Sequence, residues 1–511
     1  MTAPVTALRR LGSNAAVLAG SQIASQVAIF VRNLLVVRAL SPPEYGVAAT
    51  FLLALTLGQS FANLSIGTLV VQAPDGEEPS FQRTAQFAQA FQGFALGLLL
   101  FLGAPLIGYM FQTPDAVWCY QMLGVAAVAQ GLIHFDPTRY KRRDRFAPQA
   151  GAELFAELAS LAFVAVGVHF IHDYTIAMWA VICQNCALAV STHVLAERRY
   201  GWAWERSFAT RILSFGWPML MSSILLYVVM QGDRFLVGSA ATLTKITTDW
   251  LGAAWQPARV FDKTDLALFS IAVSITLMPT TLIARVIGNM VFPALARNQA
   301  DPARFRRVYS ACAVLNAIAG TSAAVFFILA GENATALIYT ESYRGVGAFI
   351  GWLGVIQALR ILRGSLQGAS LAMGDSQLPL WSLAARMVVV PVAVWVTITG
   401  GSLADLALTS VAGECVSLGV ALIGLNRRFA MPFAILVPPV LFNAAVLAGA
   451  FLADTQLPAG HDLLAIALGV LGSGAVPLFG LAAFPGLRAE LWGLVRPPGA
   501  SAPPQPAGTP P

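Results

Sequence analysis

Charged side chains occur inside stretches of the sequence that are otherwise apolar, where they could handle an anionic group. The candidates are the arginines Arg32, Arg234, Arg285, Arg360 and Arg363 and the carboxylates Asp233 and Glu414. A guanidinium group is planar, stays charged and binds phosphate or carboxylate oxygens through two parallel hydrogen bonds. A charge at the centre of a bilayer costs about 2.5–3.5 kcal/mol on insertion scales, so it normally faces a protein interior or a watery cavity. The pattern predicts a cationic cavity that binds an anionic substrate, with Asp233 and Glu414 as candidates for proton or sodium coupling.

Uncharged polar residues repeat at helical spacing close to these arginines. The predicted polar lining of the cavity consists of Asn14, Ser21, Gln22, Ser25, Gln59 and Asn63. At about 100° per residue, Asn14, Ser21 and Ser25 lie on one line with Arg32, and Gln22 lies on the adjoining strip. The last two members repeat the pattern on the following segment. A polar face on a membrane-spanning helix is expected to face a hydrophilic chamber.

The chain as a whole has the composition of a membrane protein. Its 511 residues are 57% hydrophobic and 11% charged, whereas soluble domains carry roughly 25% charged residues. This composition excludes a soluble enzyme and a disordered scaffold. The formal net charge of +6 comes from basic residues between apolar stretches, where the positive-inside rule accounts for them without a nucleic-acid partner.

Windows of about 20 apolar residues predict an all-α polytopic membrane protein with about 14 transmembrane helices. The predicted segments are 14–37, 47–70, 87–109, 117–135, 151–170, 175–196, 213–238, 265–290, 309–330, 346–370, 379–399, 404–425, 433–453 and 462–484. When the N-terminus is placed in the cytoplasm and the sides alternate, most of the 31 Lys and Arg residues fall in inner loops. Both termini are therefore expected in the cytoplasm.

The segments divide into two related halves. Each half begins with a stretch that runs from a basic flank to an arginine deep in the helix, Arg10 to Arg32 and Arg211 to Arg234. The predicted organisation is two pseudo-symmetric six-helix lobes, two additional C-terminal transmembrane helices and a disordered cytoplasmic tail. Their bounds are 1–200, 201–430, 431–485 and 486–511. The second half also contains a predicted long outer loop at 239–263, to which, as to the Pro-rich tail, the sequence assigns no role.

Motifs for catalysis and metal binding are weak. Cys183 and Cys186 have CxxC spacing, but they lie inside an apolar helix without a second pair, which favours small buried residues over a metal site. Glu157 is interpreted as a charged cap near the inner start of its helix. The sequence contains no Walker A motif, and no Ser-His-Asp arrangement can be argued. We therefore predict no catalytic residue, no metal and no cofactor.

Four motifs carry a resemblance to a known family. They are RNLLVVRALSPPEYG (32–46), FGWPML (215–220), DRFLVG (233–238) and FPALAR (292–297). Over about residues 10–430 the chain resembles polysaccharide-transporter flippases, the Wzx-like branch of the multidrug/oligosaccharidyl-lipid/polysaccharide exporter superfamily. The chain departs from the family after the DR motif, where Leu-Gly-x-Tyr usually follows a short gap; here the gap is long and residues 266–269 read LALF.

The resemblance implies twelve or fourteen helices, two six-helix lobes and a central cationic cavity, with Arg32 and Arg285 at positions of family cavity arginines. It implies a flippase that moves an undecaprenyl-pyrophosphate-linked oligosaccharide across the bacterial inner membrane, by alternating access of the lobes, for exopolysaccharide synthesis. The expected partners are this lipid-linked substrate, membrane lipids, and a polysaccharide polymerase with its export machinery.

Two alternatives stay open. A drug/cation antiporter of the same superfamily would favour carboxylates over arginines in its cavity. A membrane polysaccharide polymerase or ligase would need a substantial outer domain with catalytic residues.

Overall fold

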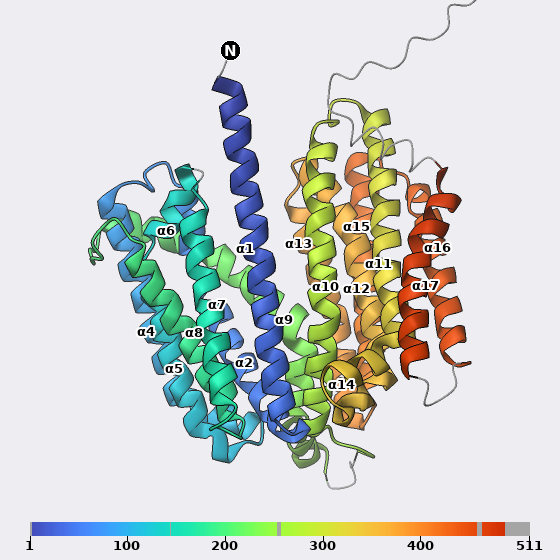
Figure 1. The fold of residues 1–511 in the computed structure, drawn as a ribbon, viewed down its shortest axis with the longest axis horizontal. Helices are drawn as coiled ribbons and strands as arrows, with labels where there is room; N and C mark the ends of the chain where they lie inside the picture. Colours follow the sequence, from blue (N-terminus) through green and yellow to red (C-terminus); the bar gives the residue numbers. More distant parts are fainter. Residues whose placement is uncertain (1–2, 144, 253–256, 457–461, 486–511) are drawn as a thin grey trace, which may run out of the picture. The chain divides into compact units, whose positions relative to one another are not determined.

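The computed structural model describes residues 3–143, 145–252, 257–456 and 462–485 (Figure 1). All regular secondary structure within these ranges is helical. In the described part, 13 helices are long and apolar enough to cross a membrane, or up to 14 if one bent helix pair counts as a single span. Each of the predicted segments coincides with at least one helix. The all-α, multi-pass fold expected from hydropathy is confirmed.

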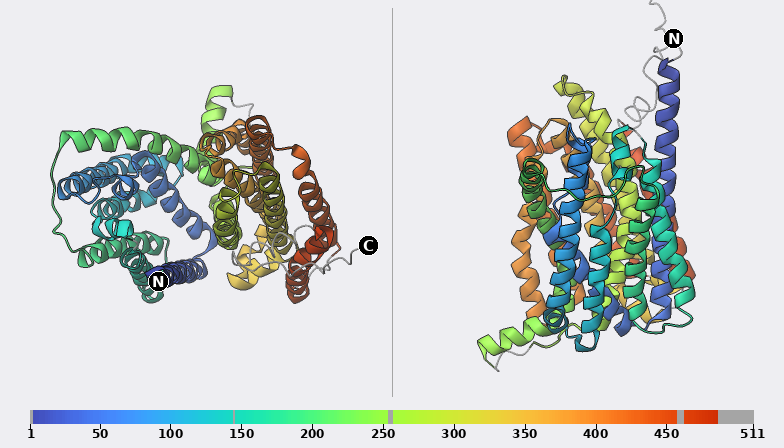
Figure 2. Two further views of the ribbon diagram at one scale, coloured as in Figure 1. Left: turned by 90° about the horizontal axis from the view of Figure 1, so that it is seen from above. Right: turned by 90° about the vertical axis from the view of Figure 1, so that its left-hand side faces the viewer.

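The chain forms two compact units, and unit 1 comprises residues 1–274, 335–348 and 387–410. Its helices are α1 (Ala3–Ala39), α2 (Pro42–Ala62), α3 (Ile66–Gln72), α4 (Pro79–Met110), α5 (Val117–Gly131), α6 (Asp136–Arg139), α7 (Ala147–Gly167), α8 (Thr175–Val194), α9 (Arg206–Leu251), the start of α10 (Lys263–Ala296) and α14 (Val390–Thr399), with short 3-10 turns at Pro114–Ala116, Tyr140–Arg143 and Glu341–Val346. Packing runs from α1 to α7, α8, α5 and α4, while α2 and α9 pack against each other and against α4. This row of helices can be followed end-on in Figure 2.

Unit 2 comprises residues 275–334, 349–386 and 411–511. It contains the rest of α10, most of α11 (Pro302–Ile338), α12 (Gly347–Ala372) and α15 (Leu403–Phe429), and all of α13 (Gln377–Ala385), α16 (Val437–Asp454) and α17 (Asp462–Ala483), with a 3-10 turn at Phe433–Ile435. The start of α15, up to residue 410, and all but the first residue of the 3-10 turn at Arg386–Val389 belong to unit 1. Leu295, Phe305, Leu366 and Leu425 contribute to one buried core that joins α10, α11, α12 and α15. A second core, which includes Val325 and Val476, attaches α16 and α17. Apolar stripes of this kind stabilise each helix against its neighbours in the unit.

This grouping by packing differs from the division expected at residues 200 and 430. Helix α9 belongs to unit 1 because it packs against α2 and α4. The six-helix halves describe a repeat along the sequence, and that repeat stays a prediction. The tail expected at 486–511 lies outside the described residues.

The prediction of a long outer loop at 239–263 is wrong over its first half, because α9 continues without a break to Leu251. Ser239, Ala240 and Thr242 are buried. The Thr242 hydroxyl donates a hydrogen bond of 2.9 Å to the carbonyl oxygen of Tyr109, at the end of α4. The small and polar residues lower the hydropathy of this stretch, which made it look like a loop, but they pack against protein.

The segment expected as one span at 47–70 is two helices. Helix α2 ends at Ala62 and α3 begins at Ile66. Ser65 adopts a left-handed backbone conformation, with φ of 49°, which residues other than Gly adopt at some energetic cost. The Asn63 side chain stabilises the break, since its Oδ1 accepts a hydrogen bond of 2.9 Å from the Ser65 backbone N–H. Non-helical backbone near membrane depth is tolerated where protein or a watery cavity surrounds it.

Candidate functional site

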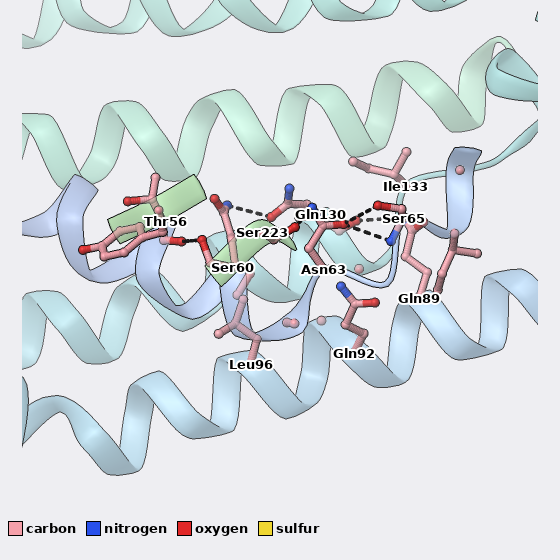
Figure 3. Close-up of a pocket in the computed structure, with 18 of the residues that line it drawn as sticks. Thr56, Ser60, Asn63, Ser65, Gln89, Gln92, Leu96, Gln130, Ile133 and Ser223 are labelled. Atoms are coloured by element: carbon pink, nitrogen blue, oxygen red, sulfur yellow. Dashed lines mark hydrogen bonds between the residues drawn. The ribbon is translucent and has the colours of Figure 1, made fainter. Parts of the chain in front are cut away.

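A polar cavity of about 570 Å³ lies inside unit 1, beside the break between α2 and α3 (Figure 3). Its polar lining residues are Thr56, Gln59, Ser60, Asn63, Ser65, Gln89, Gln92, Gln130, Thr138, Ser223 and Gln231. They come mainly from α2, α4, α5 and α9, and no Asp, Glu, Lys or Arg is among the lining residues. We call this cavity the amide pocket. Its volume falls in the range of about 300–1,000 Å³ that small-molecule sites occupy.

Several amides of the pocket hydrogen-bond to one another, and a buried amide oxygen is left without a hydrogen-bond partner. Gln59 Nε2 donates to Gln130 Oε1 at 2.8 Å, and Gln89 Nε2 donates to the Gln130 carbonyl oxygen at 3.1 Å. Asn63 Nδ2 donates to Ser223 Oγ at 3.1 Å. Gln92 Oε1 is buried and has no hydrogen-bond partner in the described structure. In Figure 3 the Gln92 amide points from α4 toward Asn63.

Close helix packing and two aromatic rings shape the walls of the amide pocket. Gly93 and Gly131 allow α4 and α5 to approach, since a Cβ atom on Gly93 would lie 2.5 Å from the Gly131 Cα. Small residues often permit such an approach between membrane helices. Tyr227 and Phe135 supply the aromatic part of the lining. The Tyr227 hydroxyl donates to the Leu53 carbonyl oxygen at 3.1 Å, which fixes the ring.

An apolar groove adjoins the amide pocket within unit 1. Its volume is about 420 Å³, and its walls include Phe61, Phe91 and Trp204. The groove and the amide pocket share Ala62, Gln92 and Leu96 as lining residues. A polar site and an apolar site therefore lie next to each other, with the Gln92 side chain between them.

Arg234, one of the predicted arginines, lies at the edge of the amide pocket. Its side chain is buried in the α9–α10 contact, where Nη2 donates to the Ser270 carbonyl oxygen and to Ser274 Oγ, both at 3.3 Å. Its Nη1 donates to Oε1 of Gln231 at 3.2 Å, and Gln231 lines the pocket. The neighbouring Asp233 accepts a hydrogen bond of 2.5 Å from Ser410 Oγ.

Arg32 is held by side chains of α7 and α8. Its Nη1 donates to Glu157 Oε2 at 3.2 Å, to Ser160 Oγ at 3.2 Å and to Gln184 Oε1 at 2.8 Å. The interpretation of Glu157 as a cap is wrong, because α7 begins at Ala147 and Glu157 lies in mid-helix, where it neutralises this arginine. Arg32 and Arg234 both belong to unit 1.

Arg360, Arg363 and Glu414 come together in unit 2. The Glu414 side chain is fully buried and accepts hydrogen bonds from Arg360 Nε at 2.6 Å and from Arg386 Nη1 at 2.7 Å. Arg363 Nη2 lies 3.4 Å from its other oxygen. Three guanidinium groups surround one carboxylate, so the cluster carries excess positive charge. Arg386 was not among the predicted site residues; its depth in the 379–399 segment was the only signal.

The remaining predicted residues are placed as follows. Arg285 is exposed on α10 in unit 2, and on α1 Ser21 and Ser25 are partly buried while Gln22 is exposed. The side chain of Asn14 lies outside the described residues. No group of three or more His, Cys, Asp or Glu side chains in the described structure could hold a metal ion.

Sequence reasoning found Gln59 and Asn63 but missed the other amides of the pocket. Gln89 and Gln92 are three residues apart on α4, and Gln130 lies near the end of α5. Residues three apart share a helix face, and amides inside an apolar helix are costly unless they find partners. That spacing was the available signal for these amides.

Three comparisons relate this chain to known proteins. The model of the polysaccharide biosynthesis protein family matches residues 35–248 and 258–347. No curated protein matches the sequence. The structure is similar to that of the lipid II flippase MurJ in an inward closed conformation, with a TM-score of 0.70 and 12% identity over 91% of this chain and 98% of that one.

A second similar structure is an inward-facing multidrug resistance MATE family transporter of the MOP superfamily. Its TM-score is 0.58, with 14% identity over 83% of this chain and 96% of that one. At these identities the likeness concerns the fold. The family model covers more than half of the chain, so this protein belongs to the polysaccharide biosynthesis protein family, as the sequence motifs predicted.

Proposed function

We propose that this protein is a flippase that moves a lipid-linked oligosaccharide across the bacterial inner membrane during polysaccharide synthesis. One observation carries the proposal: a polar pocket inside membrane-spanning helices adjoins a buried arginine through the Arg234–Gln231 hydrogen bond. Membership of a polysaccharide biosynthesis family and a fold shared with a lipid II flippase support it. The proposed substrate is an undecaprenyl-pyrophosphate-linked glycan destined for exopolysaccharide.

The physical task is to carry a polar head group through hydrocarbon. Hydroxyl groups and a diphosphate lose their hydration in the membrane, and unpaired polar groups there cost several kcal/mol each. Amides and hydroxyls offer hydrogen bonds to the sugar, while guanidinium groups pair with the diphosphate oxygens. The polyprenyl tail stays in the lipid. The protein makes and breaks no covalent bond in this reaction, so it acts as a transporter and not as an enzyme.

Individual residues receive roles in this proposal. Arg234, beside the amide pocket, contacts the diphosphate, and Arg32, Arg285, Arg360 and Arg363 attract the anionic head group along its route. Asp233 and Glu414 are the proposed sites of ion coupling, and the lobes give access alternately to the two sides. A polysaccharide polymerase and its export machinery take up the product.

The alternative of a drug/cation antiporter is less consistent with the pocket. A desolvated organic cation is stabilised most directly by a carboxylate partner. No carboxylate lines the amide pocket. Glu157 lies outside the pocket lining and is paired with Arg32.

Replacement of Arg234 tests the proposal. The full-length protein is reconstituted in proteoliposomes with a fluorescent polyprenyl-diphosphate oligosaccharide, and the fraction that reaches the opposite leaflet is measured with an impermeant quencher. We expect Arg234→Ala to slow translocation by about tenfold or more, because a charge-assisted hydrogen bond to the diphosphate contributes about 1.5–3 kcal/mol. Arg234→Lys should retain part of the rate.

Arg199→Ala is the matched control, because Arg199 is exposed in the linker between α8 and α9. Its translocation rate should equal that of the wild type. Thermal unfolding of each variant in detergent separates a loss of transport from a loss of folding. Undiminished translocation by a folded Arg234→Ala variant, or no translocation by the wild type, would reject the proposal.

A further inference from the structure

We infer that the amide pocket is a sugar subsite that binds an uncharged sugar residue of the substrate and discriminates against an acidic one. The inference rests on the proposed function and makes it more specific, since it assigns the sugar and the diphosphate to different groups of residues. The sugar lies among the amides of α2, α4 and α5. The diphosphate lies toward Arg234.

The lining of the amide pocket contains no charged residue, which disfavours an acidic sugar. A uronic acid carries a carboxylate, and a buried carboxylate without a cationic partner is strongly destabilised. None of the lining residues is charged, and Arg234 donates from its Nη1 to Gln231 at the edge of the pocket. A neutral sugar loses only hydroxyl hydration on entering, and hydroxyls can be satisfied by amides.

The amides of the pocket offer hydrogen-bond donors and acceptors to sugar hydroxyls. An amide presents one acceptor and two donors, and adjacent sugar hydroxyls both donate and accept. The Gln59–Gln130 pair keeps Gln59 Oε1 and Gln130 Nε2 without hydrogen-bond partners among the described residues. Gln92 Oε1 is an additional unpaired acceptor. A buried amide oxygen without a partner costs about 1–3 kcal/mol, a cost that a sugar hydroxyl would remove.

The surroundings of the pocket match a molecule with three chemically different parts. Tyr227 and Phe135 add ring faces for the apolar side of a sugar. The apolar groove beside Gln92 and Leu96 has the character that a polyprenyl chain requires. On another side of the pocket Gln231 leads to Arg234, which suits the diphosphate.

A binding experiment with three probes tests the inference. The full-length protein in lipid nanodiscs is titrated with polyprenyl diphosphate, polyprenyl diphosphoglucose and polyprenyl diphosphoglucuronate of equal chain length. We expect the glucose probe to bind about tenfold more tightly than the bare diphosphate, and the glucuronate probe to lose that gain. One buried hydrogen bond to a neutral group contributes about 0.5–1.5 kcal/mol, a two- to tenfold change in affinity.

Gln92→Leu is the decisive variant. Because Gln92 Oε1 has no partner in the described structure, its replacement removes no hydrogen bond of that atom and should leave the unfolding temperature unchanged or higher. Glucose-probe affinity should fall about three- to tenfold, while affinity for bare polyprenyl diphosphate stays the same. Gln130→Leu should also lower the glucose-probe affinity, and it removes the hydrogen bond that Gln59 donates to Gln130. Gln121→Leu is the control, since Gln121 lies on α5 outside the pocket lining and should change neither affinity.

The outcomes separate the two proposals. If polyprenyl diphosphate and both sugar probes fail to bind the wild type, the proposed flippase function falls. If all three bind equally, or if folded Gln92→Leu and Gln130→Leu variants keep the full glucose gain, the function stands and the sugar subsite is rejected. Tighter binding of the glucuronate probe than of the glucose probe would also reject it.

Discussion

At the scale of single residues, the buried carboxylate of Glu414 in unit 2 depends on three arginine partners. It is completely buried, accepts hydrogen bonds from Arg360 and Arg386, and forms an ion pair with Arg363. A buried ion pair adds little net stability, but removal of one partner leaves an uncompensated charge and costs about 3–5 kcal/mol. Because Glu414 serves three cations, its loss should cost more than the loss of any one arginine.

Glu414→Gln should therefore lower the free energy of unfolding by about 3–5 kcal/mol, and Arg360→Met should lower it by less. Arg360→Met reduces the excess positive charge, whereas Glu414→Gln increases it. The measurement is the midpoint of thermal unfolding of the purified protein in detergent. A matched replacement at the exposed ion pair, Glu341→Gln beside Arg344, should change stability by at most about 1 kcal/mol. Equal midpoints for Glu414→Gln and the wild type would show that Glu414 does not neutralise this cluster.

The residue scale also shows where sequence reasoning stops. The cost of a charge in lipid was sufficient to predict that Arg32 and Arg234 face protein, and both do so in unit 1. Their partners could not be predicted. Glu157 and Gln184 are more than a hundred residues from Arg32 along the chain, and helical periodicity carries no information about which helices become neighbours.

At the scale of elements, the break between α2 and α3 shapes the amide pocket. Ser65 has a positive φ of 49°, and this conformation aligns Asn63 so that it contacts both the Ser65 N–H and Ser223 Oγ. An L-residue with a branched side chain is strained there by about 1–2 kcal/mol, while glycine adopts the same backbone without strain. The break therefore depends on a residue that tolerates left-handed backbone.

Ser65→Gly should keep both the stability and the glucose-probe affinity of the wild type. Ser65→Val should lower stability by about 1–3 kcal/mol and should weaken glucose-probe binding, because the backbone that presents Asn63 to the pocket shifts. Thermal unfolding and nanodisc titration of the two variants test this. Thr68→Val is the control for a β-branched replacement, since Thr68 is exposed and helical in α3. A Ser65→Val variant that matches Ser65→Gly in both measurements would contradict the role of this break.

The elements themselves were largely predictable, and their interruptions were not. Hydropathy windows locate apolar stretches, so every expected segment coincides with a helix. A window of about 20 residues averages over a three-residue break, so α2 and α3 appeared as one span. The same averaging made the buried small residues after Gly238 look like a loop, although α9 continues to Leu251. Both errors occur where polar residues contact protein instead of water.

At the scale of the whole molecule, the distribution of basic residues predicts which side of the membrane each loop faces. Arg198 and Arg199 lie between α8 and α9, in a linker predicted to be cytoplasmic, and other basic loops alternate with loops that contain few such residues. The turn that contains His172, between α7 and α8, is expected on the opposite side. Cytoplasmic loops of membrane proteins carry an excess of Lys and Arg, and this bias sets the overall orientation. One reporter on each side of α8 tests the predicted orientation of that helix in the membrane.

Single cysteines at Arg199 and His172, in a chain whose five native cysteines are replaced by alanine, make the orientation measurable. Both positions are exposed, so reactivity depends on which compartment contains the reagent. In sealed spheroplasts an impermeant maleimide should label His172→Cys and leave Arg199→Cys unlabelled, and permeabilisation should make both react equally. Labelling of Arg199→Cys alone would mean that the orientation is the reverse of the predicted one. Labelling of both in sealed spheroplasts would place the two positions on the same side of the membrane. That result would contradict the prediction that α8, the one helix between them, spans the membrane.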